Sequence, residues 1–291
     1  MNLWQNYICP KNLSEALSAL RNAPGPLAPI AGGTDLLLDL GQGRHSPVST
    51  LIDLTSVSEM TALGPRGGRL FIGAAVSLAT ISRDIAVARH AQALVEACDL
   101  IAGPQVRNVA TLGGNVAHAL PAADGTIALM ALGATVEIAS EAGTRIIPIG
   151  ELFRGAGESA LNASQELIVG FHVPLRGERD ASAFKRVMRP QGTALPILNA
   201  AVWIRRNADI VGDVRIAVGP SGPIPRREAE AERSVVNRVF TRELSEEAVE
   251  VLLAHSAFRT SARRGSAEYR RLLADTLLSE VLSTAWGRTY R

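Results

Sequence analysis

Cysteine is scarce in this chain of 291 residues, which contains only Cys9 and Cys98. The two lie far apart and match no metal-binding spacing, so two buried thiols are the simplest interpretation. Iron–sulfur clusters are usually held by about four thiolates, and this chain has too few to ligate one by itself. Lysine is equally scarce, with only Lys11 and Lys185 among many arginines.

Long apolar runs are also lacking, since none reaches the ~18–20 residues needed to cross a bilayer. The N-terminal stretch has neither the basic segment nor the apolar core of a signal peptide, and we therefore expect a cytoplasmic location. The formal net charge is only +2 and charges of both signs are interspersed, which argues against a nucleic-acid-binding module. Length and a 47% hydrophobic content predict a globular protein of about two domains.

Helical and strand patterns are mixed in the first part of the chain. Apolar spacing over residues 12–22, with Asn12 and Glu15 at its start, predicts a capped helix. A helical pattern also runs from Ser77 to about Ala102. Strands are expected at 27–31, 49–54, 69–76 and 166–174, with a hairpin over 135–149.

After about residue 176 the pattern changes. Three strand candidates follow one another at 181–188, 197–206 and 209–219, and such a run predicts an antiparallel sheet. Two helices are expected at 245–257 and 266–286. We place a linker near 175–180, which divides the chain into domains 1–176 (subdomains about 1–57 and 58–176) and 177–291.

Two segments, "AGGTD" (31–35) and "LGGNV" (112–116), share a double glycine followed by a small polar residue. Glycine lets the backbone approach a ligand closely, and successive exposed N–H groups form an anion-binding nest. Thr34, Thr111 and Asn115 add further polar groups. Neither segment is a Walker A loop or a G-x-G-x-x-G fingerprint. Taken singly, each is better explained as a turn, whereas together they would grip a pyrophosphate from two sides.

Longer strings carry more information. "PIAGGTDLL", "IAGPQVRNVATLGGNVAHALPAAD" and "SAEYRRLL" together resemble the FAD-binding (medium) subunit of the molybdenum hydroxylase family, which includes xanthine dehydrogenase and carbon monoxide dehydrogenase. The resemblance covers nearly the whole chain in order. It implies an α+β protein: a two-subdomain FAD-binding fold of the vanillyl-alcohol oxidase (PCMH) type, followed by a C-terminal antiparallel three-stranded sheet with helices.

The resemblance also implies cofactor contacts. The first loop would cradle the FAD pyrophosphate with Ile30, Ala31, Gly32, Gly33, Thr34, Asp35 and Leu36. The second loop, near the pyrophosphate and the flavin side, would contribute Thr111, Gly113, Gly114 and Asn115. Further contacts are implied for Ile101, Ala102, Asp124, Ile168 and Lys185.

Each of these assignments has a simpler alternative. Asp124 and Asp35 are also residues that begin helices, and Ile101 and Ile168 are also ordinary core residues. Lys185 on a strand is also explained as a solvated side chain. His118 lies in the second loop, but nothing indicates catalysis or covalent flavin attachment. We assign no catalytic residue and no metal ligand.

The function implied by the resemblance is electron transfer. A small partner with [2Fe–2S] clusters would deliver electrons to FAD on this chain, and a large partner would hold the molybdopterin. NAD, a quinone or another compound would be the acceptor. A self-contained FAD-dependent oxidase or reductase of the same fold, and a non-enzymatic α/β module, are the alternatives. The segment Pro190–Pro196 departs from the relatives' pattern, which leaves the flavin-ring contacts open.

Overall fold

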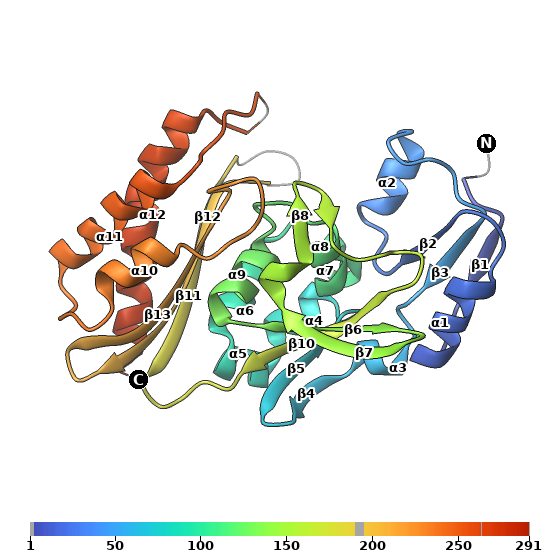
Figure 1. Ribbon diagram of the computed structural model, residues 1–291, viewed down its shortest axis with the longest axis horizontal. Helices are drawn as coiled ribbons and strands as arrows, with labels where there is room; N and C mark the ends of the chain where they lie inside the picture. The colour runs from blue at the N-terminus through green and yellow to red at the C-terminus, as the bar shows by residue number, and fades with distance from the viewer. Residues whose placement is uncertain (1–2, 190–194, 263, 291) are drawn as a thin grey trace.

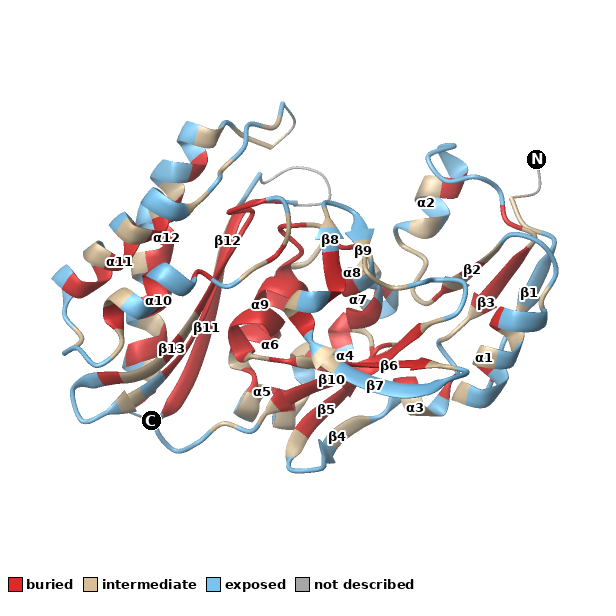
Figure 2. Cartoon of the chain, in the orientation of Figure 1, coloured by how far each residue is buried: buried red, intermediate tan, exposed pale blue. Residues whose placement is uncertain are grey.

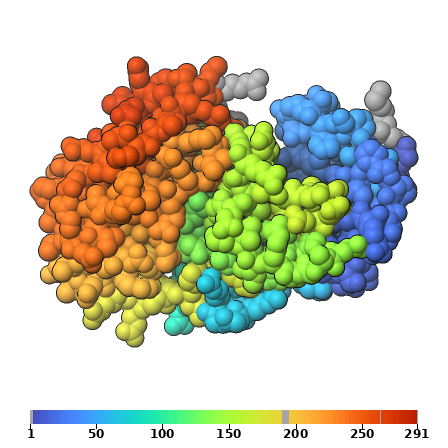
Figure 3. Space-filling model, viewed as in Figure 1, coloured from blue at the N-terminus to red at the C-terminus, as the bar shows by residue number. Residues whose placement is uncertain are grey.

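The computed structural model describes residues 3–189, 195–262 and 264–290. Three parts follow one another along the chain and across the molecule (Figure 1): a small N-terminal part, a middle part, and a C-terminal part. Figure 3 shows the surface recessed between the N-terminal part and the C-terminal helices, above the middle part.

The N-terminal part is a small parallel sheet with short helices. Its strands β1 (Asn6–Ile8), β2 (Leu27–Ile30) and β3 (Thr50–Asp53) lie in the order β1-β3-β2. The helices are α1 (Leu13–Asn22), α2 (Leu36–Gly41) and α3 (Ser58–Thr61). The cap expected at Asn12 is confirmed, because its side chain accepts a hydrogen bond from the Glu15 N–H at 2.9 Å.

The middle part contains a five-stranded sheet in the order β4-β5-β10-β6-β7. These strands are β4 (Leu63–Arg66), β5 (Arg69–Gly73), β6 (Thr135–Ser140), β7 (Gly143–Pro148) and β10 (Leu167–Pro174). A 3-10 turn η1 (Ile149–Leu152) and the short pair β8 (Phe153–Gly155) and β9 (Glu158–Ser159) follow β7. The middle part also contains the helices α4 (Leu78–Arg83), α5 (Ile85–His90), α6 (Gln92–Leu100), α7 (Pro104–Val109), α8 (Leu112–Ala117) and α9 (Asp124–Leu132). Of these, α5, α8 and α9 contact the sheet.

The C-terminal part is the expected antiparallel sheet, formed by β11 (Asp180–Met188), β12 (Pro196–Asn207) and β13 (Ile210–Gly219). One face of this sheet packs on α10 (Ala229–Val235), α11 (Arg242–His255) and α12 (Ala267–Arg288). Its other face contributes to the core of the middle part, through Phe184, Ala201, Trp203 and Ala217. The two longest parts of the chain therefore share one hydrophobic core.

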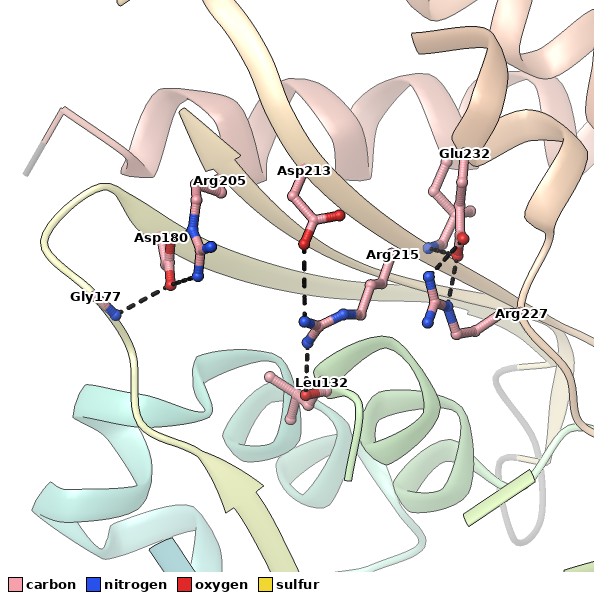
Figure 4. A network of polar contacts seen from close by, with 9 residues as sticks. Leu132, Gly177, Asp180, Arg205, Asp213, Arg215, Arg227 and Glu232 are labelled. Atoms are coloured by element: carbon pink, nitrogen blue, oxygen red, sulfur yellow. Dashed lines mark hydrogen bonds and ion pairs between the residues drawn. The ribbon is translucent and has the colours of Figure 1, made fainter. Parts of the chain in front are cut away.

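Helix α9 lies at the centre of this shared core, and all nine of its residues are buried (Figure 2). It contacts both β12 and β13 on one side and α6 on the other. Arg215 of β13 reaches across and donates to the Leu132 carbonyl at the end of α9, at 3.2 Å (Figure 4). The contact satisfies one of the carbonyls that every helix end leaves unpaired.

The expected α+β architecture is confirmed, with differences in detail. The helical stretch from Ser77 to about Ala102 is three helices, α4, α5 and α6. The elements that were not predicted are the strands β1, β4, β8 and β9 and the helices α2, α3, α7, α8, α9 and α10. Most of the segment Pro190–Pro196 lies outside the described residues.

Candidate functional site

The first glycine loop leaves β2 after Ile30 and enters α2. Within the described residues, no acceptor is found for the backbone N–H groups of the four successive residues Gly32 to Asp35. Gly33 has a φ of +68°, in the left-handed region that favours glycine. Successive free N–H groups around such a residue form a concave nest for an anion.

The second loop differs from the first, because its N–H groups are already used. Gly113 N–H donates to the Ala74 carbonyl at 2.8 Å, and Gly114 N–H donates to Thr111 Oγ1 at 3.1 Å. Thr111 is thus the N-cap of α8. The idea of two equivalent nests is therefore modified: the free N–H donors lie on the first loop.

The structure brings the two loops together. A Cβ on Gly32 would lie 2.1 Å from the Val109 carbonyl oxygen, just before the second loop, so backbone packing requires glycine there. The Asp35 carboxylate lies 3.4 Å from Nδ1 of His118 at the end of α8. The hydrogen bond between them lowers the pKa of Asp35 and raises the pKa of His118.

Asp124 begins α9 and is buried in an ion pair with the C-terminal part. Its carboxylate lies 2.5 Å from Nη1 of Arg186 on β11 and accepts a hydrogen bond from Nδ2 of Asn199 on β12, also at 2.5 Å. The same Arg186 side chain donates to the Leu100 carbonyl. Burial raises the pKa of Asp124, while Arg186 and Asn199 oppose the rise.

Several polar atoms around Asp124 are buried without a hydrogen-bond partner in the described part of the chain. They are Asn115 Oδ1, Thr126 Oγ1, Arg186 Nε and Asn199 Oδ1. Buried polar groups are nearly always paired, so orphaned atoms gathered in one region indicate that a ligand or water completes the network. Asn115 belongs to the second loop and packs against Gly125, which joins this region to the loops.

Ile101 and Ala102 form the turn after α6, with Ala102 at a φ of +47°. Arg107 fixes this turn by donating to both of their carbonyls, at 3.0 and 2.7 Å. The turn directly follows Leu100, whose carbonyl Arg186 holds. Ile168 lies further away on β10, 7% exposed in the core, although the next residue bonds to Ala74 beside the second loop.

Lys185 is a predicted contact that lies outside this region. It lies on the opposite face of β11 from Arg186, and its Nζ pairs with Glu280 of α12 at 2.7 Å. Arg186 and Asn199, which the sequence analysis missed, occupy the face toward Asp124. The alternation of side chains along a strand was the available signal, since it places neighbours 185 and 186 on opposite faces.

A loop with four free N–H groups, set against a second glycine loop, is an arrangement suited to the pyrophosphate of a dinucleotide. Comparison with known proteins identifies the family. Residues 3–176 match the model described as "FAD binding domain in molybdopterin dehydrogenase", and residues 182–285 match "CO dehydrogenase flavoprotein C-terminal domain". The chain belongs to this family of molybdopterin dehydrogenase flavoproteins.

Individual relatives agree. The chain is 31% identical to the putative xanthine dehydrogenase FAD-binding subunit of Escherichia coli (strain K12), over 96% of this chain and 95% of that one. It is 34% identical to the nicotine 6-hydroxylase medium subunit of Paenarthrobacter nicotinovorans, over 97% and 98%. Its fold matches a carbon monoxide dehydrogenase chain from Hydrogenophaga pseudoflava with a TM-score of 0.91 and 27% identity, over 98% of each chain.

The protein is therefore an oxidoreductase subunit whose cofactor is FAD. The donor set fits that cofactor, because the first loop offers free N–H groups to a pyrophosphate. In the ranges that the structure describes, no group of three or more side chains is arranged to hold a metal ion. No helix among the described residues is long and apolar enough to span a membrane.

Proposed function

We propose that this chain holds FAD between its two glycine loops and relays electrons within a heteromeric molybdenum hydroxylase. The observation that carries the proposal is the run of four free N–H groups from Gly32 to Asp35, held against the second loop. The proposed acceptor is NAD or another small oxidant, and the proposed location is the cytoplasm.

In this proposal each part of the site has its own task. The N–H groups of the first loop bind and neutralise the pyrophosphate. The rest of the cofactor is lined by Asn115 of the second loop and by the turn at Ile101–Ala102. The buried ion pair of Asp124 with Arg186 holds the C-terminal sheet against the middle part. FAD, when bound, exchanges electrons one or two at a time, which lets it join single-electron donors to two-electron acceptors.

The relatives support the partner arrangement. Their names describe an FAD-binding subunit and a medium subunit, and this chain covers nearly all of each. We propose a small partner with [2Fe–2S] clusters as the electron donor and a large molybdopterin-binding partner as the site of substrate oxidation. Purification from the native host should then yield molybdenum, iron and FAD together with this chain, in fixed ratio. Recovery of this chain alone, with a substrate oxidation of its own, would support a self-contained oxidase instead.

The cofactor site is tested with a matched pair of glycines. Gly33 and Gly43 both have a φ of +68°, and Gly43 has open space around its Cβ position. Alanine at either position carries a similar backbone strain of ~1–2 kcal/mol. At Gly33 its Cβ would also lie 3.0 Å from Leu37 Cδ1 and 3.1 Å from Ile30 Cδ1, so thermal unfolding of both variants is measured beside FAD retention. We expect Gly33→Ala to lose FAD in equilibrium dialysis and Gly43→Ala to retain it. Equal FAD retention by both variants would contradict the nest on the first loop.

A further inference from the structure

A cavity lies where the middle part meets the C-terminal part, and no residue of the glycine loops lines it. Its volume is about 330 Å³, at the lower end of the roughly 300–1,000 Å³ typical of small-molecule sites. The end of α5, the linker after β10, the strands β11 and β12 and the end of α12 all contribute to its wall. The cavity therefore bridges the two parts.

Positive charge gathers around this cavity. Arg89, Arg176 and Arg288 line it together with His90, and no carboxylate does so among the described residues. The charge of Arg288 is neutralised by Glu96, which does not line the cavity and lies 2.5 Å from the Arg288 guanidinium. Arg89 and Arg176 have no carboxylate within 4 Å in the part of the chain that the structure describes.

The carboxylate of Asp180, near Arg176, is already paired with another arginine. Asp180 is paired with Arg205 at 2.8 Å and accepts from the Gly177 N–H at 3.1 Å, as Figure 4 shows. The Arg176 guanidinium donates to two backbone carbonyls, from Nε to Asp180 at 2.5 Å and from Nη2 to Arg288 at 3.5 Å. Among the described residues, no carboxylate therefore pairs with Arg89 or Arg176.

Hydrogen-bond donors are held in place at the cavity. The Arg176 N–H donates to Nδ1 of His90 at 3.1 Å, which leaves the proton of the neutral ring on Nε2. Burial, followed by the charges of Arg89 and Arg176, lowers the pKa of His90. Ser182 Oγ accepts from the Ala93 N–H at 3.1 Å, and its own proton remains available to donate.

We infer that this cavity is a binding site for a small oxyanion, a phosphate or carboxylate group, held by Arg89, Arg176 and His90. The Trp203 side chain in the wall offers apolar surface to a short organic portion of the ligand. Because both parts of the chain supply contacts, the bound anion stabilises the junction between them. The site is independent of the FAD loops.

The test is titration calorimetry of the full chain with inorganic phosphate and, separately, with acetate, at constant ionic strength. We expect saturable binding of at least one of the two, and the preferred ion identifies the ligand group. Arg89→Gln and Arg176→Gln should each weaken the affinity by about fivefold, as expected for the loss of a partly exposed cation. The matched control is Arg83→Gln, which removes an exposed arginine of α4 outside the cavity and should leave the affinity unchanged.

Location is checked by fluorescence. The ion that binds in calorimetry should change the tryptophan emission of the parent chain, and Trp203→Phe should abolish that response while calorimetric binding persists. The Gly33→Ala variant should bind the same ion at the cavity as the parent does, which separates this site from the FAD loop. The inference is overturned if neither ion binds saturably, or if Arg83→Gln weakens binding as much as Arg89→Gln.

Discussion

At the scale of single residues, the glycines of the two loops differ in their surroundings. Gly32 faces the backbone of Val109 and Ala110, and Gly113 faces Ala74, so both are required by packing within the chain. Gly114 is exposed and only Thr111 Oγ1, at 3.3 Å, lies near its Cβ position. The space beside Gly114 is therefore free for a ligand to enter.

This difference predicts opposite effects of alanine. Gly32→Ala should destabilise the fold by about 1–3 kcal/mol, because backbone atoms must move apart. Gly114→Ala should keep or raise stability by up to about 1 kcal/mol, since alanine favours the helix, and should lower FAD affinity. Thermal unfolding and flavin content measure the two effects. Full flavin retention by Gly114→Ala would show that the cofactor does not approach this residue.

The pair of Asp35 and His118 makes the contact between the loops depend on pH. The raised pKa of His118 means that its contribution is full below its ordinary value of 6.5 and is lost as pH rises through the raised value. The lowered pKa of Asp35 means that its contribution is present above 3.8 and is lost as pH falls through the lowered value. Contact between the loops is therefore strongest in mildly acidic solution.

An NMR titration of the histidine ring protons checks this directly. We expect a His118 pKa above 6.5, and a fall toward 6.5 in Asp35→Asn. The pair is partly exposed, so its effect on overall stability should stay below about 1 kcal/mol. A His118 pKa that is the same in both proteins would remove Asp35 as the cause.

At the scale of elements, strand β11 separates two neighbouring cations. Arg186 is buried against Asp124, whereas Lys185 and Glu280 form a pair whose side chains are 41% and 52% exposed. Arg186→Met should cost about 3–5 kcal/mol, because it leaves a buried carboxylate without its partner. Lys185→Met should cost less than about 1 kcal/mol and should keep the flavin.

Denaturant unfolding and flavin content of these two variants form a matched test on adjacent positions. A greater loss of stability in Lys185→Met than in Arg186→Met would contradict the orientation of β11. Loss of flavin from Lys185→Met alone would restore the cofactor contact that the family resemblance implies for this lysine.

Elements with clear periodicity or turn chemistry were predictable. These elements are the hairpin of β6 and β7 and the three strands of the C-terminal sheet. Their sequences either alternate apolar and polar residues or are apolar runs bounded by turns. Strand β1 has only three residues, and β4 contains Gly64 and Pro65, so neither carries a strand signal. Helix α9 is apolar on all sides, and such a run does not distinguish a buried helix from a strand.

At the scale of the whole molecule, the two parts of the chain complete one core. Phe184, Ala201 and Trp203 of the C-terminal sheet belong to the same cluster as the helices of the middle part. A fragment of residues 1–176 would expose the apolar surface of α6 and α9 that this sheet covers. We therefore expect the fragment to aggregate or to bind a hydrophobic dye, whereas co-expression with 177–291 should restore a folded product.

Size-exclusion chromatography and dye fluorescence distinguish these states. A monomeric fragment 1–176 with sharp, cooperative unfolding would show that the first part is independently stable. The control is the full chain with the linker cleaved near 176, in which both parts remain together.

The sequence identified the two loops and Asp124 as a set, but not how they are joined. The sequence analysis explained Gly32 by the close approach of a ligand. In the fold, the Val109 carbonyl oxygen already lies where a Cβ on Gly32 would clash with it. Long-range partners such as Arg186 and Asn199 could not be assigned to Asp124 from one sequence, because strand pairing and the docking of two parts decide them. Motifs describe local backbone, whereas the buried network depends on tertiary packing.

The complete burial of α9 also has a consequence for synthesis. A helix with no polar face cannot remain exposed to water, yet β12 and β13, which cover it, leave the ribosome long after Leu132. At about 5–20 residues per second, translation leaves the interval open for several seconds. During that time the nascent chain carries an uncovered apolar helix, and we expect chaperones to bind the chain at α9.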